Sequence, residues 1–77
     1  MIPEIDLHGL DRDEALVEVD REINHAFIQE TNERCLLFIT GWGGVLRPIV
    51  QSFLAEHPLV KRISVDGPSL RIELEDL

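Results

Sequence analysis

The stretch from Cys35 to Arg47 constrains the fold of this chain more than any other. Five apolar residues in a row, Cys35–Ile39, predict a strand covered on both faces, because apolar and polar residues stop alternating where neither face meets water. Glycines follow at positions 41, 43 and 44, and helical spacing resumes from Val45. A helix that starts at a glycine turn presents unpaired backbone N–H groups, which favour an anion such as a phosphate. Any functional site is therefore expected at this turn.

Length and composition limit the chain to one small domain, residues 1–77. An apolar fraction of 44% suffices to build a core. The longest apolar run is the one just described, far short of the ~20 residues that span a bilayer, and the first residues do not resemble a signal peptide. The one cysteine cannot form an internal disulfide. These features predict a cytoplasmic protein without a membrane partner.

The charge balance is strongly acidic. Fifteen Asp and Glu against seven Lys and Arg give a formal net charge of −8, and Lys61 is the only lysine. Cations that neutralise phosphates supply much of the affinity for nucleic acids, so this charge predicts only weak binding of DNA or RNA. The simpler interpretation is that the acidic surface serves solubility.

Apolar spacing along the rest of the chain predicts four strands and two helices. Strands are expected over residues 2–7, 35–39, 59–65 and 70–74, and helices over about 12–29 and 45–57. Asp11 and Glu14 have the spacing of a capping box for the first helix. Pro48 suits the first turn of the second helix, and Asp66-Gly67-Pro68 suits a hairpin turn.

The order βαβαββ predicts an α/β fold of the α+β two-layer sandwich type. Right-handed crossovers make the first two strands parallel and place both helices on one face of a four-stranded mixed sheet. Such a fold leaves the other sheet face open, which conflicts with a strand at 35–39 that is buried on both faces. A central position for this strand eases the conflict, and self-association through the open face would remove it.

Two loops are expected at one edge of this sheet, because ligands bind beyond the carboxyl ends of neighbouring parallel strands. Residues 6–9 end the first strand and residues 40–44 end the second. Asp6 and His8 share a face if the strand continues through His8, and a carboxylate that orients an imidazole favours general acid–base chemistry. The simpler interpretation of Asp6 is a turn or capping residue.

Two other residues near the glycine turn are candidates for binding. Trp42, the only tryptophan, suits stacking on a base or insertion at an interface, or else folds back over the edge of the core. Arg47 lies at a helix N-terminus, against the helix dipole, which fits a phosphate contact. His25 and His57 are isolated and are expected on the surface, so no metal site is predicted.

These residues resemble the Smr domain, the small MutS-related domain. Its first motif, Leu-Asp-x-His-Gly, is matched by residues 5–9, and its second, His- or Thr-Gly-x-Gly, is matched by residues 40–43. Matching flanks at 45–47 and 56–60 extend the resemblance to nearly the whole chain, from Ile5 to Leu74. The resemblance implies the βαβαββ fold, similar to the C-terminal domain of a bacterial translation initiation factor.

The resemblance also implies a function. Smr domains are known as nicking DNA endonucleases, as RNA endonucleases and as nucleic-acid-binding modules, so a nucleic-acid-binding protein is expected, with hydrolase activity on phosphodiester bonds and a link to DNA repair, recombination or RNA processing. Asp6 and His8 would be the catalytic or substrate-orienting pair. The expected phosphate-binding residues are Gly9, Thr40, Gly41, Trp42, Gly43, Gly44 and Arg47. The cofactor is unknown, and nuclease chemistry allows a divalent cation such as Mg²⁺.

The glycine loop departs from the common family pattern in ways that keep other hypotheses open. Trp42 stands where many members carry lysine, and the loop is one residue shorter. A non-catalytic module is the alternative, binding a protein partner or a second copy as a homodimer through Trp42 and the open sheet face. A third hypothesis is a small-metabolite phosphate binder that uses the glycine turn.

Overall fold

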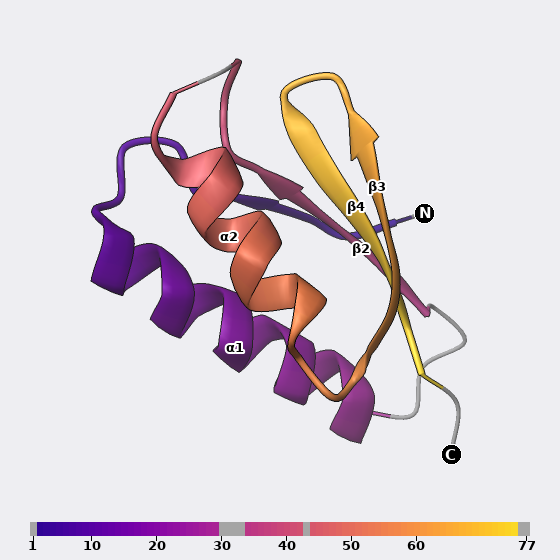
Figure 1. Cartoon of the computed structure of the whole chain (residues 1–77). Coiled ribbons are helices and arrows are strands. Elements are labelled where there is room, and N and C mark those ends of the chain that lie inside the picture. The colour runs from indigo at the N-terminus through magenta and orange to yellow at the C-terminus, as the bar shows by residue number, and fades with distance from the viewer. Residues whose placement is uncertain (1, 30–33, 43, 76–77) are drawn as a thin grey trace.

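The computed structural model describes residues 2–29, 34–42 and 44–75 (Figure 1). The elements are β1 (Glu4–Asp6), α1 (Arg12–Ile28), β2 (Cys35–Ile39), α2 (Leu46–Ala55), β3 (Val60–Asp66) and β4 (Ser69–Leu74). This order confirms the predicted βαβαββ succession. The bounds of β2 match the prediction, while β1 is shorter at both ends and α2 ends two residues early.

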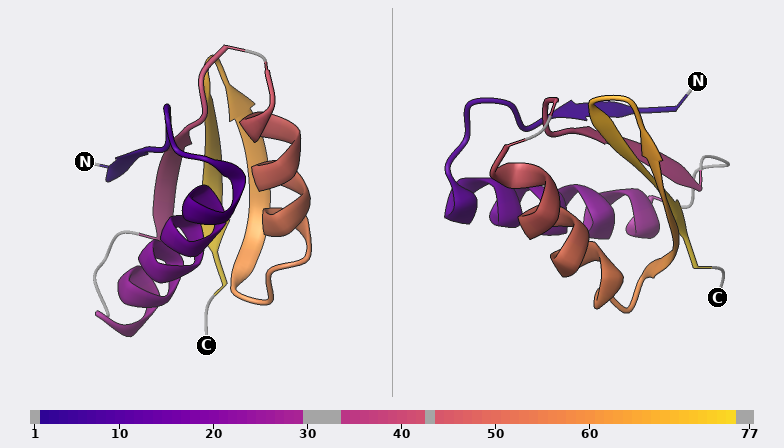
Figure 2. Two further views of the ribbon diagram at one scale, coloured as in Figure 1. Left: turned by 90° about the vertical axis from the view of Figure 1, so that its left-hand side faces the viewer. Right: turned by 45° about the horizontal axis from the view of Figure 1, so that its top comes forward.

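The four strands form one mixed sheet in the order β1-β2-β4-β3. β1 pairs with β2 in parallel, and the other two pairings are antiparallel. Both helices cover the same face of the sheet, as the two views of Figure 2 show. The two-layer arrangement is therefore confirmed, and β2 occupies an interior position between β1 and β4.

The expectation that β2 is covered on both faces is wrong. Leu36 and Phe38 are buried on the helix side, whereas the three alternate residues on the open face, Cys35, Leu37 and Ile39, are only half-buried. Leu37 pairs with Glu4 on β1 and with Arg71 on β4. An interior strand can carry apolar residues on an open face, because side chains of both neighbouring strands flank them.

The core lies between the sheet and the helices. Among the described residues, its central cluster is built from buried apolar side chains: Leu7, Val19, Ile23, Leu36, Phe38, Val50, Leu54, Leu70, Ile72 and Leu74. α1 supplies its part from one stripe of the helix, as its three- and four-residue spacing predicts. Neither described helix is long and apolar enough to cross a membrane.

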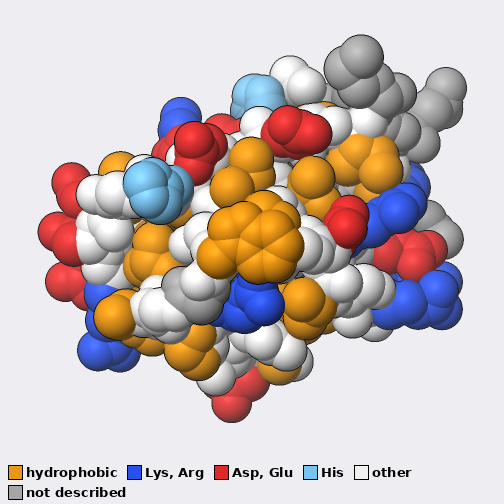
Figure 3. Space-filling view, turned by 90° about the horizontal axis from the view of Figure 1, so that it is seen from above, with side chains coloured by type: hydrophobic (Ala, Val, Ile, Leu, Met, Phe, Trp, Pro, Cys, Tyr) orange, Lys and Arg blue, Asp and Glu red, His pale blue; other side chains and the backbone are white. Residues whose placement is uncertain are grey.

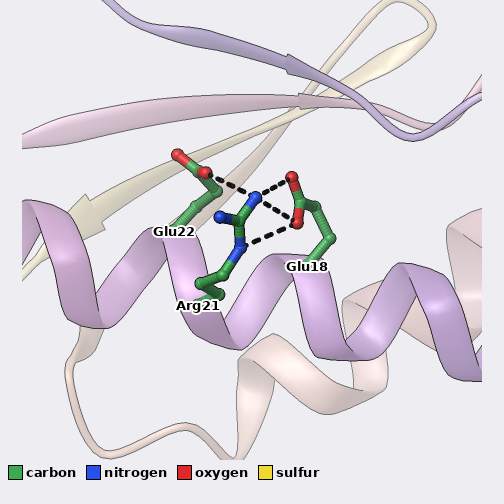
Figure 4. Close-up of polar contacts among 3 residues, drawn as sticks. All are labelled: Glu18, Arg21 and Glu22. Carbon is green, nitrogen blue, oxygen red and sulfur yellow. Dashed lines mark hydrogen bonds and ion pairs between the residues drawn. The ribbon is translucent and has the colours of Figure 1, made fainter.

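The start and the solvent face of α1 follow from its sequence. The Asp11 side chain accepts a hydrogen bond from the backbone N–H of Glu14 at 2.8 Å, and the Glu14 carboxylate accepts one from the N–H of Asp11 at 3.1 Å. This is the predicted capping box. On the solvent face, Arg21 binds Glu18 at 2.6 Å and Glu22 at 3.5 Å (Figure 4). The hydrogen bonds that the Arg21 guanidinium donates to Glu18 raise the pKa of Arg21.

His57 is not the surface residue that its sequence context predicts. Its side chain is only 7% exposed, and Nε2 lies 2.9 Å from Oδ1 of Asp20 on α1. Nδ1 accepts a hydrogen bond from the N–H of Leu59, so the ring proton resides on Nε2 and is donated to Asp20. The imidazole thus joins α1 to the segment between α2 and β3. His25 is exposed, as expected.

Candidate functional site

Three loops meet at one end of the sheet, at the top of Figure 1. They are the β1–α1 loop (residues 7–11), the β2–α2 loop (residues 40–45) and the β3–β4 turn (residues 67–68). The first two were expected here because β1 and β2 are parallel. The third joins them because β4 pairs with β2, with Ser69 opposite Ile39. We call this end of the molecule the three-loop site.

The β1–α1 loop carries the Asp6–His8 pair. β1 ends at Asp6, so the strand does not continue through His8, and the expectation of a shared strand face is wrong. Oδ1 of Asp6 instead accepts a hydrogen bond from the backbone N–H of His8 at 2.9 Å. This bond closes a turn that projects His8 and Gly9, both exposed, from the sheet. Asp6 thereby positions the backbone of His8 rather than its imidazole.

The imidazole of His8 lies against the glycine loop. Its Cδ2 atom is 3.6 Å from the position that a Cβ at Gly41 would occupy. Within the described ranges, no group forms a hydrogen bond with the His8 ring. The two motifs singled out in the sequence are therefore adjacent, and no described residue occupies the ring nitrogens of His8.

The β2–α2 loop is held by the β3–β4 turn. The backbone N–H groups of Thr40 and Gly41 both donate to the carbonyl oxygen of Pro68 at 3.0 Å, and the Thr40 hydroxyl lies 3.4 Å from the same oxygen. Gly41 has a φ of +94° and Gly44 one of +101°, which side-chain-bearing residues rarely adopt. Gly43 lies outside the described residues. Because the N–H groups of Thr40 and Gly41 are already paired, an anion at this loop would have to accept hydrogen bonds from backbone N–H groups later in the chain.

The start of α2 offers such groups. The residue before the helix, Val45, makes no side-chain capping hydrogen bond. Helical N–H groups in the first turn have no partner within the helix itself. The first turn of α2 follows the glycine loop directly, with Pro48 at its third position as predicted.

Arg47 ties the β2–α2 loop to the β3–β4 turn. Its guanidinium donates from one terminal nitrogen to the carbonyl oxygen of Gly67, and that nitrogen makes a longer contact of 3.5 Å with the carbonyl oxygen of Gly41. The Nε atom is buried, and it has no hydrogen-bond partner in the described part of the chain. The bonds to Gly41 and Gly67 give Arg47 a structural role that its sequence position does not reveal. A phosphate contact by its guanidinium stays a prediction.

Trp42 is exposed rather than folded into the core. Its side chain is 79% exposed, and the edge of its six-membered ring rests on Gly67, with Cη2 and Cζ2 at 3.6 and 3.9 Å from the position of an added Cβ. Figure 3 shows this end of the molecule from above, with hydrophobic side chains at its centre and acidic and basic ones around them. Of the two placements considered from the sequence, the exposed one is correct.

The β3–β4 turn is the part of the site that sequence reasoning missed. Gly67 and Pro68 supply two carbonyl oxygens and the surface beneath Trp42. The Asp-Gly-Pro signal predicts a hairpin turn and nothing about its neighbours, because hydrophobic spacing does not give the order of strands in a sheet.

No group of three or more His, Cys, Asp or Glu side chains in residues 2–29, 34–42 and 44–75 is arranged to hold a metal ion. Mg²⁺ often binds proteins through one or two carboxylates together with the phosphate oxygens of a substrate. Asp6, which is exposed at the three-loop site, is a carboxylate of that kind.

Comparison with known proteins identifies the family. The Smr domain family model matches residues 5–69, which include both loop motifs and most of the chain. The chain belongs to the Smr domain family. The predicted resemblance is thus confirmed over the region that builds the three-loop site.

The relatives found by sequence are long proteins, and the region that matches this Smr domain is a small part of each. Endonuclease MutS2 of Caldicellulosiruptor saccharolyticus is 40% identical over 58 residues, which are 74% of this chain and 7% of that protein. Endonuclease MutS2 of Thermomicrobium roseum is 39% identical over 67 residues, which are 86% of this chain and 8% of that protein. The chain therefore spans less than a tenth of the length of these relatives.

Solved structures agree with the fold of this Smr domain. The Smr domain of Thermus thermophilus MutS2 superposes with a TM-score of 0.90 at 27% identity, covering 97% of this chain and 100% of that one. The human small-MutS related domain gives a TM-score of 0.77 at 30% identity, covering 92% and 99%. The βαβαββ architecture is thus that of Smr domains.

Proposed function

We propose that this Smr domain binds nucleic acid at the three-loop site and cleaves phosphodiester bonds there. One observation carries the proposal: the exposed His8 ring, without a hydrogen-bond partner among the described residues, lies 3.6 Å from the Cβ position of Gly41. A group able to transfer protons thus adjoins a loop that leads into an uncapped helix start. The two relatives named above are endonucleases, which supports the same chemistry.

His8 is the catalytic residue in this proposal. Its neutral imidazole takes the proton from the attacking oxygen, and its protonated form gives a proton to the leaving oxygen of the phosphodiester. Asp6 contributes as a positioning residue, because its carboxylate holds the N–H of His8 at 2.9 Å. A divalent cation bound by that carboxylate would neutralise charge on the phosphate.

The phosphate would lie between His8 and the first turn of α2. Exposed Gly9 and Gly44 bring no side chain between backbone and ligand, and Arg47 adds a positive charge at the loop. With a net charge of −8, attraction to the nucleic-acid backbone is small. Binding is therefore expected to be weak and to fall further as salt is raised.

Cleavage assays with matched histidine variants test the proposal. Wild-type protein is incubated with RNA and with structured and nicked DNA at low salt, with and without Mg²⁺. Loss of a general acid–base group typically costs about 10²- to 10⁴-fold in rate, so His8→Ala should lose cleavage by this factor. His25→Ala removes an exposed imidazole from α1 and should cleave at the wild-type rate.

Two outcomes would refute the enzymatic proposal. One is cleavage by His8→Ala at the wild-type rate, which would point to another group or to a contaminating nuclease. The other is that wild-type protein neither shifts nor cuts any of these substrates at micromolar concentration.

A further inference from the structure

Trp42 is the most exposed large hydrophobic side chain among the described residues. It is 79% exposed, so only about a fifth of its surface is covered. The covered part includes the edge of the six-membered ring on Gly67. Shielding one whole face of an indole would hide far more than this, so at least one face of the ring is open to solvent. The core does not require a tryptophan here.

The backbone beneath and before this indole is held in place. Pro68 accepts hydrogen bonds from the N–H groups of Thr40 and Gly41, which directly precede Trp42. Arg47 bonds to the carbonyl oxygens of Gly67, under the ring, and of Gly41. An aromatic ring on a braced backbone loses little conformational freedom on binding, which is the advantage of a pre-organised contact.

The indole is also close to the proposed catalytic group. The His8 ring lies 3.6 Å from the position that a Cβ of Gly41 would occupy, and Gly41 is the residue before Trp42. Consecutive Cα atoms are about 3.8 Å apart. Trp42 is thus the residue directly after the one that the His8 ring adjoins.

We propose that Trp42 is a stacking platform for an unpaired nucleobase, so that the three-loop site selects single-stranded or flipped-out nucleotides over closed duplex. This inference rests on the proposed function and specifies its substrate class. Bases inside a duplex are stacked on their neighbours and have no free face for an indole, whereas every unpaired base has one. Stacking also supplies affinity that does not depend on cations, in a chain with a net charge of −8.

Intrinsic fluorescence gives a direct test, because the chain has one tryptophan and no tyrosine. Wild-type protein is titrated at low salt with three probes: a single-stranded oligonucleotide, an abasic oligonucleotide of equal length and charge, and a duplex whose ends are closed by hairpin loops of abasic sites. Base stacking should quench the Trp42 fluorescence with the first probe and leave it nearly unchanged with the other two.

Variants measure how much the indole contributes. From the typical free energy of one base–aromatic stacking contact, Trp42→Ala should weaken binding of the single strand about 5- to 140-fold. The slope of affinity against salt should stay the same, because no phosphate contact is lost. Trp42→Phe should retain part of the affinity. Ile28→Ala, which trims a 75%-exposed apolar side chain at the end of α1 and outside the three-loop site, should bind like wild type.

The inference is overturned if the abasic oligonucleotide binds and quenches as well as the single strand. It is also overturned if Trp42→Ala binds the single strand as tightly as wild type, or binds all three probes more weakly by one factor. In these cases cleavage that depends on His8 still supports the proposed function. If wild-type protein binds none of the three probes at low salt, the proposed function fails together with the inference.

Discussion

The β1–α1 and β2–α2 loops lie side by side and are held by different kinds of contact. In the first, the side-chain bonds join residues two or three positions apart, Asp6 to His8 and Asp11 to Glu14, and one backbone bond, from the N–H of Leu7 to the carbonyl oxygen of Ile39, continues the pairing of β1 with β2. In the second, the side chain before the helix caps nothing, and the bonds reach Gly67 and Pro68 in the β3–β4 turn. The turn that carries the proposed catalytic group is therefore closed by local side-chain bonds, whereas the surface beside it depends on bonds to a distant turn.

The largest expected effect on stability comes from removing the hydrogen bonds by which Arg47 holds the β2–α2 loop to the β3–β4 turn. Arg47→Ala removes the bonds to Gly41 and Gly67, and hydrogen bonds to charged groups contribute about 1.5–3 kcal/mol. The substitution also removes the buried Nε, whose lack of a hydrogen-bond partner costs stability, and this offsets part of the loss. The free energy of unfolding in urea should therefore fall by about 2 kcal/mol.

Arg62→Ala is the matched control for Arg47→Ala. It removes an ion pair to Glu73 at 3.3 Å from an arginine side chain that is 68% exposed, and should cost less than about 0.5 kcal/mol. Equal losses in the two variants would show that Arg47 does not hold the loop.

A smaller effect is expected from removing the local hydrogen bond that caps α1. Asp11→Ala removes the acceptor for the N–H of Glu14, and loss of such a cap typically costs about 1 kcal/mol. Amide chemical shifts should change around residues 8–15 and the fluorescence of Trp42 should not, since the hydrogen bonds that hold the backbone before Trp42 go to the β3–β4 turn. Asp13→Ala removes a first-turn carboxylate that is not the cap and should cost less. Quenching or shifting of the Trp42 emission in Asp11→Ala would contradict this expectation.

The smallest effect is expected where a cap is added. A serine caps a helix from an extended backbone, such as that of Asp11, with φ −77° and ψ 176°. Val45 has φ −83° and ψ −38°, which is already helical. Val45→Ser should therefore stay within about 0.5 kcal/mol of wild type in thermal unfolding. A gain of about 1 kcal/mol would contradict this. It would show that α2 lacks a cap only because Val45 has no polar side chain, and that its backbone conformation does not prevent capping.

The contrast between the loops also explains what the sequence predicts and what it does not. The capping box, the bounds of β2 and the place of Pro48 in α2 were predictable, because each depends on residues close together in the chain. The bond between His57 and Asp20 joins residues 37 positions apart and has no local signal. The β3–β4 turn was missed at the site for the same reason. Periodicity shows which face of a strand is buried, but not which strand is its neighbour.

The interior position of β4 has a consequence for how the molecule is made. β4 is the last element in the chain, yet it lies between β2 and β3. During synthesis, which runs from the N-terminus, β2 keeps one edge unpaired and β3 keeps both unpaired until residues 69–74 have left the ribosome. The same step delivers Gly67 and Pro68 to the glycine loop. Insertion of β4 between β2 and β3 and completion of the three-loop site are therefore one event, so a chain halted before β4 would be prone to aggregate and would lack part of its site.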